Sequence, residues 1–222
     1  MLTYTIEVLL KSSTLVGSGT GFGANIDADV VLDPSGIPYI PAKRIKGCLR
    51  DSARQIAEIL EKSQIKISPE KDASRHIEQI FGKPGADHAA MFFFYDMTIA
   101  PEDKEWLTYL HKKYPFLLSH EAITDAFTEI RQQTAIDTQT GVTQPHSLRT
   151  IRVIKEGIKF ISKIEILENP IEPWLITLLS MACKNFRHIG TKRNRGFGSI
   201  ECKLYDEQGK ETLEKLEELC KD

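Results

Sequence analysis

Three cationic side chains alternate with glycines in a short segment near the end of the sequence, His188–Gly198 (HIGTKRNRGFG). Glycine has no Cβ, so backbone N–H groups can approach an anion closely, while Lys and Arg supply the charge that attracts phosphate. The segment, here called the late loop, therefore predicts a phosphate-binding site. The alternative is a glycine-rich turn between a helix and a strand, with solvated charges. The residues assigned to the site are His188, Gly190, Lys192, Arg193, Arg195, Gly196 and Gly198.

A second cationic set follows Pro41, which suits the first turn of a helix. Spacings of three and four put these cations on one face and an apolar stripe on another. The cations are Lys43, Lys46, Arg50 and Arg54, and the stripe is Ile45, Leu49, Ala53, Ile56 and Leu60. Gly47 costs a helix about 1 kcal/mol relative to alanine, so we expect another backbone to approach it. The basic face predicts RNA contact, and the alternative is a solvated face with an incidental glycine.

A glycine-rich stretch near the N-terminal end, Leu15–Gly23, has glycine at every second position. It superficially resembles a dinucleotide-binding loop, but that motif must open a helix directly. An alternating segment, Asn25–Asp33, follows instead and ends in a turn at Pro34–Gly36. We therefore predict a mobile loop followed by an acid-lined segment that contains Asp27 and Asp29, and we call the whole stretch, Leu15–Asp33, the first loop.

The average charge conceals an uneven distribution. The 222 residues are 41% hydrophobic with a formal net charge of −2, but Pro173–Ile200 contains no acid and five Lys or Arg residues. The segment from Glu201 to Asp222 carries eight acids against four lysines. We infer a basic patch and an acidic tail.

Cysteines at 48, 183, 202 and 220 lack paired metal-ligand spacing, so we expect reduced thiols and no zinc site. The longest apolar run, Pro173–Cys183, is too short to span a bilayer. We expect a soluble, cytoplasmic protein without a membrane partner.

The pattern of strands and helices predicts an α+β, ferredoxin-like (RRM-like) domain, with helices on one face of a four-stranded antiparallel sheet. Sheets of this kind often carry RNA. The expected strands are Leu2–Leu10, Met91–Ile99 at the sheet centre, Leu148–Ile154, Ile158–Leu167 and Ser199–Tyr205, with a turn at Glu156-Gly157 and a helix over Pro173–Phe186. We expect one domain, 1–222, with insertions at about 61–90 and 101–146, a protruding hairpin at about 132–147 and a C-terminal helix at 211–220. Within the second insertion, a helical connection over 101–131 should bury Trp106, Leu107, Leu110 and Tyr114.

Three motifs in this order resemble the RAMP superfamily of CRISPR-associated RNA-binding proteins, and the resemblance spans nearly the whole chain. They are the glycine loop after the first strand, the helix start Ile40-Pro41-Ala42-x-x-x-Lys46-Gly47-x-x-Arg50, and Gly190-x-x-Arg193-x-Arg195-Gly196-x-Gly198. The resemblance implies a subunit that holds CRISPR RNA, with Gly19 and Gly21 among its contacts. The helix start departs from the Gly-Ser-Ser usual in backbone subunits and is more similar to the type III-D group.

The segment Thr134–Gly141, followed by Leu148 and Gly157-x-x-Phe160, resembles the thumb of type III effector subunits. The resemblance implies that Ile136, Asp137 and Thr140 belong to a thumb that wedges between guide and target bases. The implied partners are CRISPR RNA, target RNA and other subunits of the complex.

The resemblance also implies a role for an aspartate in the first loop. Backbone subunits cut target RNA with an aspartate six residues before an Asp-Pro turn, which is Asp27 here because Asp33-Pro34 forms the turn; Asp29 is the neighbouring alternative. Cutting would need Mg²⁺ or another divalent metal, and no other tightly bound cofactor is expected. We expect any such chemistry across the sheet from the late loop. Otherwise both acids are ordinary turn residues.

Three other functions stay open at this stage. A capping subunit would bind the conserved end of the guide without cutting. A guide-processing endonuclease generally has a histidine near its first helix, but none precedes His76, and His188 is better explained as a phosphate contact. The chain could also be a protein-interaction module that binds no RNA.

Overall fold

The computed structural model describes residues 2–19, 21, 25–64, 73–83, 90–137, 139–145, 147–167 and 171–213. The strands are β1 (Leu2–Leu10), β2 (Phe92–Phe94), β3 (Thr128–Gln133), β4 (Arg149–Ile154), β5 (Lys159–Ile166) and β6 (Ile200–Tyr205). The helices are α1 (Ala42–Lys62), α2 (Ala73–Phe81), α3 (Pro101–Lys113), α4 (His120–Phe127), α5 (Pro173–Asn185) and the 3₁₀ turn η1 (Arg193–Arg195).

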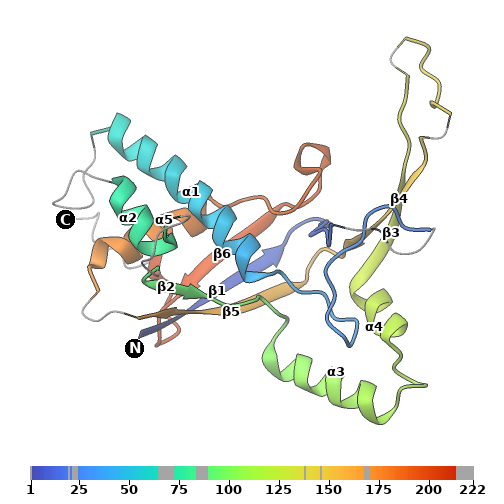
Figure 1. The fold of residues 1–222 in the computed structure, drawn as a ribbon, viewed down its shortest axis with the longest axis horizontal. Helices are drawn as coiled ribbons and strands as arrows, with labels where there is room; N and C mark the ends of the chain where they lie inside the picture. The colour runs from blue at the N-terminus through green and yellow to red at the C-terminus, as the bar shows by residue number, and fades with distance from the viewer. Residues whose placement is uncertain are drawn as a thin grey trace.

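The main sheet has the order β2-β5-β1-β6, and every neighbouring pair is antiparallel. Side chains alternate across a strand, so Ile6, Val8 and Leu10 of β1 enter one buried face. Helices α1, α2 and α5 cover this face (Figure 1). The predicted α+β, ferredoxin-like fold with helices on one face is therefore confirmed. The apolar stripe of α1 is also confirmed, with Ile45 and Leu49 fully buried.

The opposite, open face of the sheet carries charges that are paired across neighbouring strands. The ammonium of Lys159 lies 3.1 Å from a carboxylate oxygen of Glu7, and that of Lys11 lies 3.0 Å from Glu201. Lys203 contacts both Glu201 and Glu211. These cations are neutralised locally, so this face is a poor candidate for binding a polyanion.

The prediction of a central strand over Met91–Ile99 is wrong. Strand β2 has three residues and lies at the sheet edge, because β5 and β1 occupy the two central positions. Beyond Phe94 the chain stays beside β5, where Thr98 forms a bridge with Ile161, and it also supports α1. A carboxylate oxygen of Asp96 accepts the first N–H of that helix, from Ala42, at 2.7 Å.

Two predictions about the chain between 101 and 158 are also wrong. The expected helical connection ends early, since residues 128–133 form β3 and pair with β4 from Thr128↔Ile154 to Gln133↔Arg149. The expected turn at Glu156-Gly157 does not join two paired strands, because the Gly157 N–H donates to the Leu10 carbonyl and leads the chain into the main sheet. The β3–β4 ribbon projects from the body of the molecule (Figure 1).

The chain expected to form a protruding hairpin continues this ribbon. Ile136 pairs with Thr143 beyond the ends of β3 and β4. At the base of the ribbon, the Ser13 hydroxyl donates to a Glu129 carboxylate oxygen at 2.7 Å, and Thr14 pairs with Ile154. The hairpin, here called the thumb, is thus attached at its base to the chain that follows β1.

The predicted buried stripe of the 101–131 connection is wrong. No residue of α3 is fully buried, Trp106 is 60% exposed, and Tyr114 is exposed just beyond the helix. The cause is placement, since α3 lies at the border of the fold (Figure 1). Leu107 and Leu110 are half-buried.

Two further predictions concern the C-terminal helix and membrane spans. The C-terminal helix expected at 211–220 lies outside them beyond Leu213. Within the ranges that the structure describes, no helix is both long enough and apolar enough to cross a membrane.

Candidate nucleic-acid interface

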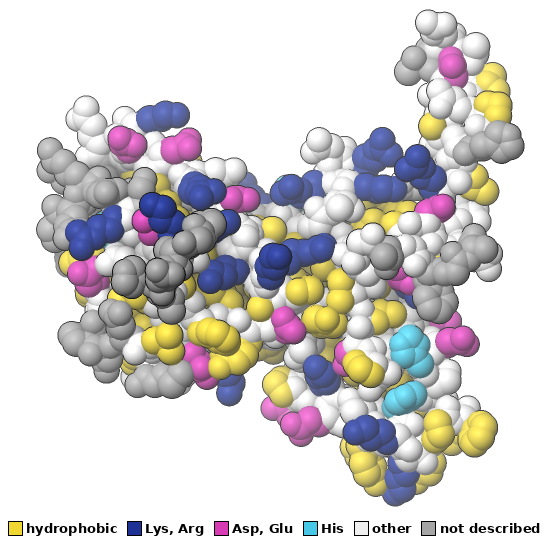
Figure 2. Space-filling view, viewed as in Figure 1, with side chains coloured by type: hydrophobic (Ala, Val, Ile, Leu, Met, Phe, Trp, Pro, Cys, Tyr) yellow, Lys and Arg dark blue, Asp and Glu magenta, His cyan; other side chains and the backbone are white. Residues whose placement is uncertain are grey.

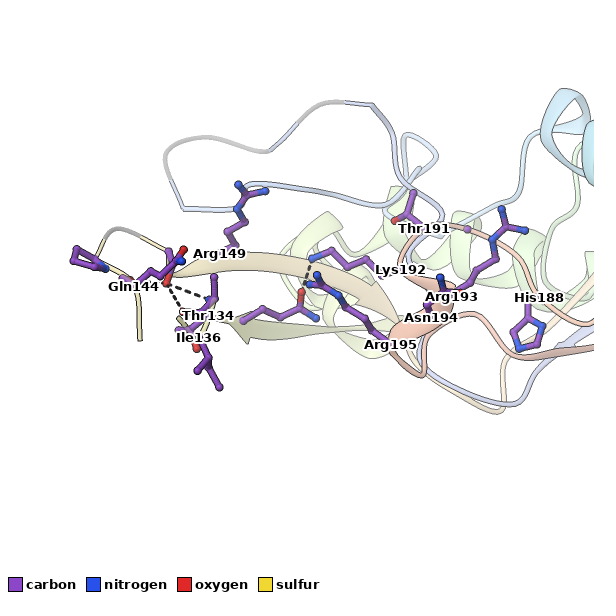
Figure 3. Close-up of a pocket in the computed structure, with 15 residues that line it drawn as sticks. Thr134, Ile136, Gln144, Arg149, His188, Thr191, Lys192, Arg193, Asn194 and Arg195 are labelled. Atoms are coloured by element: carbon purple, nitrogen blue, oxygen red, sulfur yellow. Dashed lines mark hydrogen bonds between the residues drawn. The ribbon is translucent and has the colours of Figure 1, made fainter. Parts of the chain in front are cut away.

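An open cleft of about 1420 Å³ separates the thumb from the late loop (Figure 3). The thumb contributes Gln133, Ile136 and Arg149, and the late loop contributes Lys192, Arg193 and Arg195. None of the described residues that line this cleft carries a carboxylate. We call it the thumb cleft. Its lining cations are the kind of surface that binds a chain of phosphates.

The late loop owes its shape to two glycines that the surrounding protein requires. Gly190 and Gly198 have φ values of +84° and +77°, and a Cβ on them would lie 2.3 Å from the Leu15 carbonyl oxygen and 2.0 Å from that of Ile189. Both glycines therefore allow close packing of protein backbone, and their contact with phosphate stays a prediction. Gly196 also has a positive φ, but no described atom lies within 4 Å of its Cβ position, so it faces open space.

Lys192 is the most constrained cation of the cleft. It adopts a left-handed backbone conformation with φ 60°, which is uncommon for a residue other than glycine, and its ammonium donates to the side chain of Gln133. Burial lowers the pKa of Lys192, and so do the charges of Arg195 and Arg149, while Asp27 opposes the shift. Side chains from the late loop, the thumb and the first loop therefore interact electrostatically at one point.

The first loop lies beside the late loop, which corrects the prediction that it lies across the sheet. The Thr191 N–H donates to the Leu15 carbonyl at 3.1 Å. The guanidinium of Arg44 donates to the Gly17 carbonyl at 2.8 Å and so connects the first turn of α1 to the same loop. Gly21 is required for packing, since its Cβ would lie 2.3 Å from the Ile26 carbonyl oxygen, whereas Gly19 is open.

Asp27 and Asp29 occupy different environments. Asp27 is exposed, and its Oδ2 accepts the Thr150 N–H at 2.7 Å. Asp29 is only 7% exposed, and its Oδ2 lies 3.1 Å from Nη1 of Arg152, while its Oδ1 accepts the Val30 N–H. Asp29 therefore has a structural role beneath the loop. Of the two, only Asp27 is exposed, and its charge interacts with Lys192 of the cleft.

Asp27 fits a metal only as part of a site shared with RNA. The described residues contain no group of three or more His, Cys, Asp or Glu that could hold an ion. Mg²⁺ is commonly held by one or two carboxylates together with substrate phosphates. Asp27 is exposed, and no described residue donates a hydrogen bond to its Oδ1.

Helix α1 contributes a neighbouring basic surface and does not line the thumb cleft. Lys46 lies on the side toward β2, with its ammonium 5.9 Å from the centroid of the Phe94 ring, and its pKa is lowered by burial and then by Arg50. Lys43 is exposed, as is Arg54, which contacts Asp51 at 3.5 Å. Figure 2 shows Lys and Arg side chains over α1 and at the base of the thumb.

Gly47 lies in the middle of this surface. No described atom lies within 4 Å of its Cβ position, so the expected approach of another protein backbone is not found. The side of α1 toward the late loop carries Arg44 and Cys48 instead. Burial raises the pKa of the Cys48 thiol, while the nearby charges of Arg193 and Arg44 oppose the shift. The α1 surface and the late loop are thus adjoining regions.

The tip of the thumb is held by Asp137. Its Oδ1 accepts the N–H groups of Gln139 and Thr140, both at 2.9 Å, and these bonds, Thr140 first, lower the pKa of the carboxyl. Ile136 and Val142 are exposed on the same hairpin. An ordered turn therefore presents apolar side chains to solvent.

Sequence reasoning did not assign several residues that line the cleft, among them Gln133, Arg149 and Asn194. Gln133 and Arg149 face each other as the last pair of β3 and β4. If the segments before and after the predicted hairpin had been paired as two strands, both residues would have been placed at the base of the thumb. Asn194 lies between two assigned arginines, and its neighbours were the available signal.

Comparison with known proteins gives the family. The model of the RAMP superfamily matches residues 7–201. The chain belongs to the RAMP superfamily. This confirms the resemblance inferred from the ordered motifs, while the finer likeness to the type III-D group stays a prediction. A search of curated proteins finds no significant match.

Solved structures share the fold of this RAMP chain. A chain of the cryo-EM structure of the Type III-B Cmr-beta bound to cognate target RNA matches with a TM-score of 0.62 and 14% identity, covering 92% of this chain and 97% of that chain. A chain of the Cmr-beta apo state gives a TM-score of 0.60 and 14% identity, covering 91% and 96%. At this identity the likeness concerns the fold.

Proposed function

We propose that this RAMP protein binds CRISPR RNA as a subunit of a type III RNA-guided effector complex. One observation carries the proposal: the thumb cleft gathers Arg149, Lys192, Arg193 and Arg195, and no carboxylate is among its described lining residues. Membership of the RAMP superfamily and the shared fold with Cmr-beta subunits support it.

The geometry suggests how a single strand would be held. Arginine donates to phosphate oxygens in a planar fork, and Lys192 adds a point charge. Gly196 leaves space beside these groups for the RNA backbone. The exposed apolar side chains Ile136 and Val142 on the thumb are suited to contact base faces, which agrees with a wedge between guide and target.

A filter-binding assay with guide RNA tests the proposal. Changing Lys192, Arg193 and Arg195 to Ala should weaken binding at least about 100-fold and reduce the slope of log K against log salt by about 2, since a single strand loses roughly 0.7 per phosphate contact. The matched control changes Lys11, Lys159 and Lys203 on the open sheet face to Ala. Equal losses in the two triple variants would contradict the assigned site.

A second function, cutting of target RNA, is favoured by the contrast between exposed Asp27 and buried Asp29. A bound divalent ion would activate the RNA 2′-hydroxyl and stabilise the leaving oxygen. The chain's part is to supply the Asp27 carboxylate, whose orientation is held by the Thr150 N–H, and to neutralise phosphate with Lys192.

Assembled complex with labelled complementary RNA and Mg²⁺ tests the cutting function. Asp27→Asn should slow cleavage by at least about 100-fold without changing RNA affinity. Asp125→Asn, at an exposed aspartate of α4, is the control. Cleavage that persists in the Asp27 variant would remove Asp27 from the chemistry and leave RNA binding unaffected.

A capping role is separated from a backbone role by copy number. Native mass spectrometry of the assembled complex should show several copies of a backbone subunit or one copy of a cap. A protein-interaction module without RNA binding predicts no salt-dependent affinity for guide RNA.

A further inference from the structure

Helix α3 stands out because the molecule itself does little to stabilise it. None of its 13 residues is fully buried, and within the described part of the chain its one ion pair joins Lys104 to Asp33 at 3.9 Å. A helix of this length is marginal alone in water and normally depends on packing of one face. Figure 1 shows α3 at the border of the fold, and in Figure 2 this projecting region displays hydrophobic, Lys and His side chains.

One seam of α3 exposes two aromatic rings between two charges. Glu102, Trp106, Tyr109 and Lys113 are spaced by four, three and four residues, which puts them on one face. Trp106 is 60% exposed and Tyr109 is 49% exposed. Their rings stack with centroids 5.9 Å apart, so they present one continuous apolar surface.

The charges at the two ends of this helix have opposite sign. Glu102 and Asp103 lie in the first turn, and Lys112 and Lys113 in the last. Among the residues described, none of these four has an ion-pair partner. The Lys113 ammonium instead donates to the Tyr109 hydroxyl at 2.9 Å. The helix dipole favours this order of charges, but it does not explain two exposed aromatic rings.

We propose that α3 docks antiparallel on α3 of a second copy of this chain, about a two-fold axis that passes between Trp106 and Tyr109. In this arrangement Glu102 faces Lys113 of the second copy. Each Trp106 meets the Tyr109 of the other copy. A two-fold axis repeats every contact, so one self-complementary helix face is sufficient.

A second copy suits this surface better than RNA does. Glu102 and Asp103 would repel phosphate at one end of the seam. The exposed side chains of Phe116 and Leu117 extend the apolar surface beyond the other end, toward the first turn of the opposing helix. Aliphatic and aromatic side chains framed by complementary charges are typical of a protein contact. The interface is separate from the thumb cleft and needs no RNA.

A single pair of short helices forms a small interface, so we expect a weak, concentration-dependent dimer. Sedimentation equilibrium of the full chain without RNA, up to about 1 mM, should show this dimer. Trp106→Ala/Tyr109→Ala should raise the dissociation constant at least about tenfold. Phe93→Ala is the matched control, since Phe93 is 52% exposed on β2 and should leave association unchanged.

Charge reversal gives the sharper test. Glu102→Lys and Lys113→Glu should each be monomeric, because each makes the paired ends alike. An equimolar mixture should form a heterodimer, and high salt should dissociate it. Circular dichroism checks that each variant is folded. A wild-type chain that stays monomeric, a dimer that survives the aromatic double change, or a mixture that stays monomeric would each overturn the proposal.

Discussion

The thumb cleft and the open face of the main sheet carry cations in comparable number, but the groups that contact these cations differ. On the sheet face, Lys159 and Lys11 each contact a carboxylate on a neighbouring strand. In the cleft, Lys192 contacts an amide oxygen of Gln133, and no described lining residue is acidic. The density of cations therefore does not locate a polyanion site. The local absence of neutralising acids does.

The two regions also differ in how deeply their ion pairs are buried. The Arg152–Asp29 pair lies under the first loop, where its side chains are 15% and 8% exposed, whereas Lys159 is 51% exposed. Removing one partner of a buried pair leaves an uncompensated charge, so Asp29→Ala should lower stability by about 3–5 kcal/mol. Glu7→Ala on the sheet face should lower it by about 1 kcal/mol or less. Urea unfolding of both variants measures the difference, and similar losses would break the comparison.

Giving the cleft the acid that it lacks should make it behave like the sheet face. Gln133→Glu would pair the Lys192 ammonium and repel phosphate, so guide RNA affinity should fall about tenfold, or about 1.4 kcal/mol. Gln132→Glu adds the same charge on the opposite side of β3 and is the control. Filter binding at fixed salt measures both. An equal effect of the two changes would show that net charge alone matters.

The reverse change tests whether the sheet face is a concealed site. Glu7→Gln/Glu201→Gln would free Lys159 and Lys11 from their partners. In the background of the cleft triple variant, this change should raise RNA affinity by no more than about threefold, since few phosphates could be contacted together. Recovery to wild-type affinity in the same assay would remove the distinction between the two regions.

The smallest effect concerns the stability of the free protein. The pKa of Lys192 is lowered, first by burial and then by Arg195 and Arg149, so its charge opposes folding at neutral pH. Between the pKa of Lys192 in the folded protein and its pKa in the unfolded chain, the unfolded chain binds more protons. The loss of stability caused by the charged Lys192 therefore disappears as the pH rises through this window.

Lys192→Met should therefore stabilise the RNA-free protein slightly at pH 7 while it weakens RNA binding. The gain over wild type should shrink toward the unfolded pKa of about 10.4. Thermal melts of both proteins across this range measure it. A gain that is independent of pH would assign the effect to the strained backbone or to side-chain packing.

Local patterns in the sequence were sufficient for the fold class, the α1 core stripe, the thumb hairpin and the cations of the late loop. Alternation in β1 and helical spacing in α1 are properties of neighbouring residues, so they survive without knowledge of the fold. The edge position of β2 and the exposure of α3 were mispredicted. Both depend on which distant segments compete for the same sheet or core.

By itself, the sequence determined where charge and glycine concentrate, and through ordered motifs it determined the RAMP resemblance. Only the tertiary structure decided which groups share a site. It brought the first loop beside the late loop through the Thr191–Leu15 bond, separated exposed Asp27 from buried Asp29, and placed Gln133 and Arg149 opposite Lys192. These arrangements follow from packing between segments far apart in the chain, where a hydrogen bond or a buried pair sets distances that spacing along the sequence does not specify.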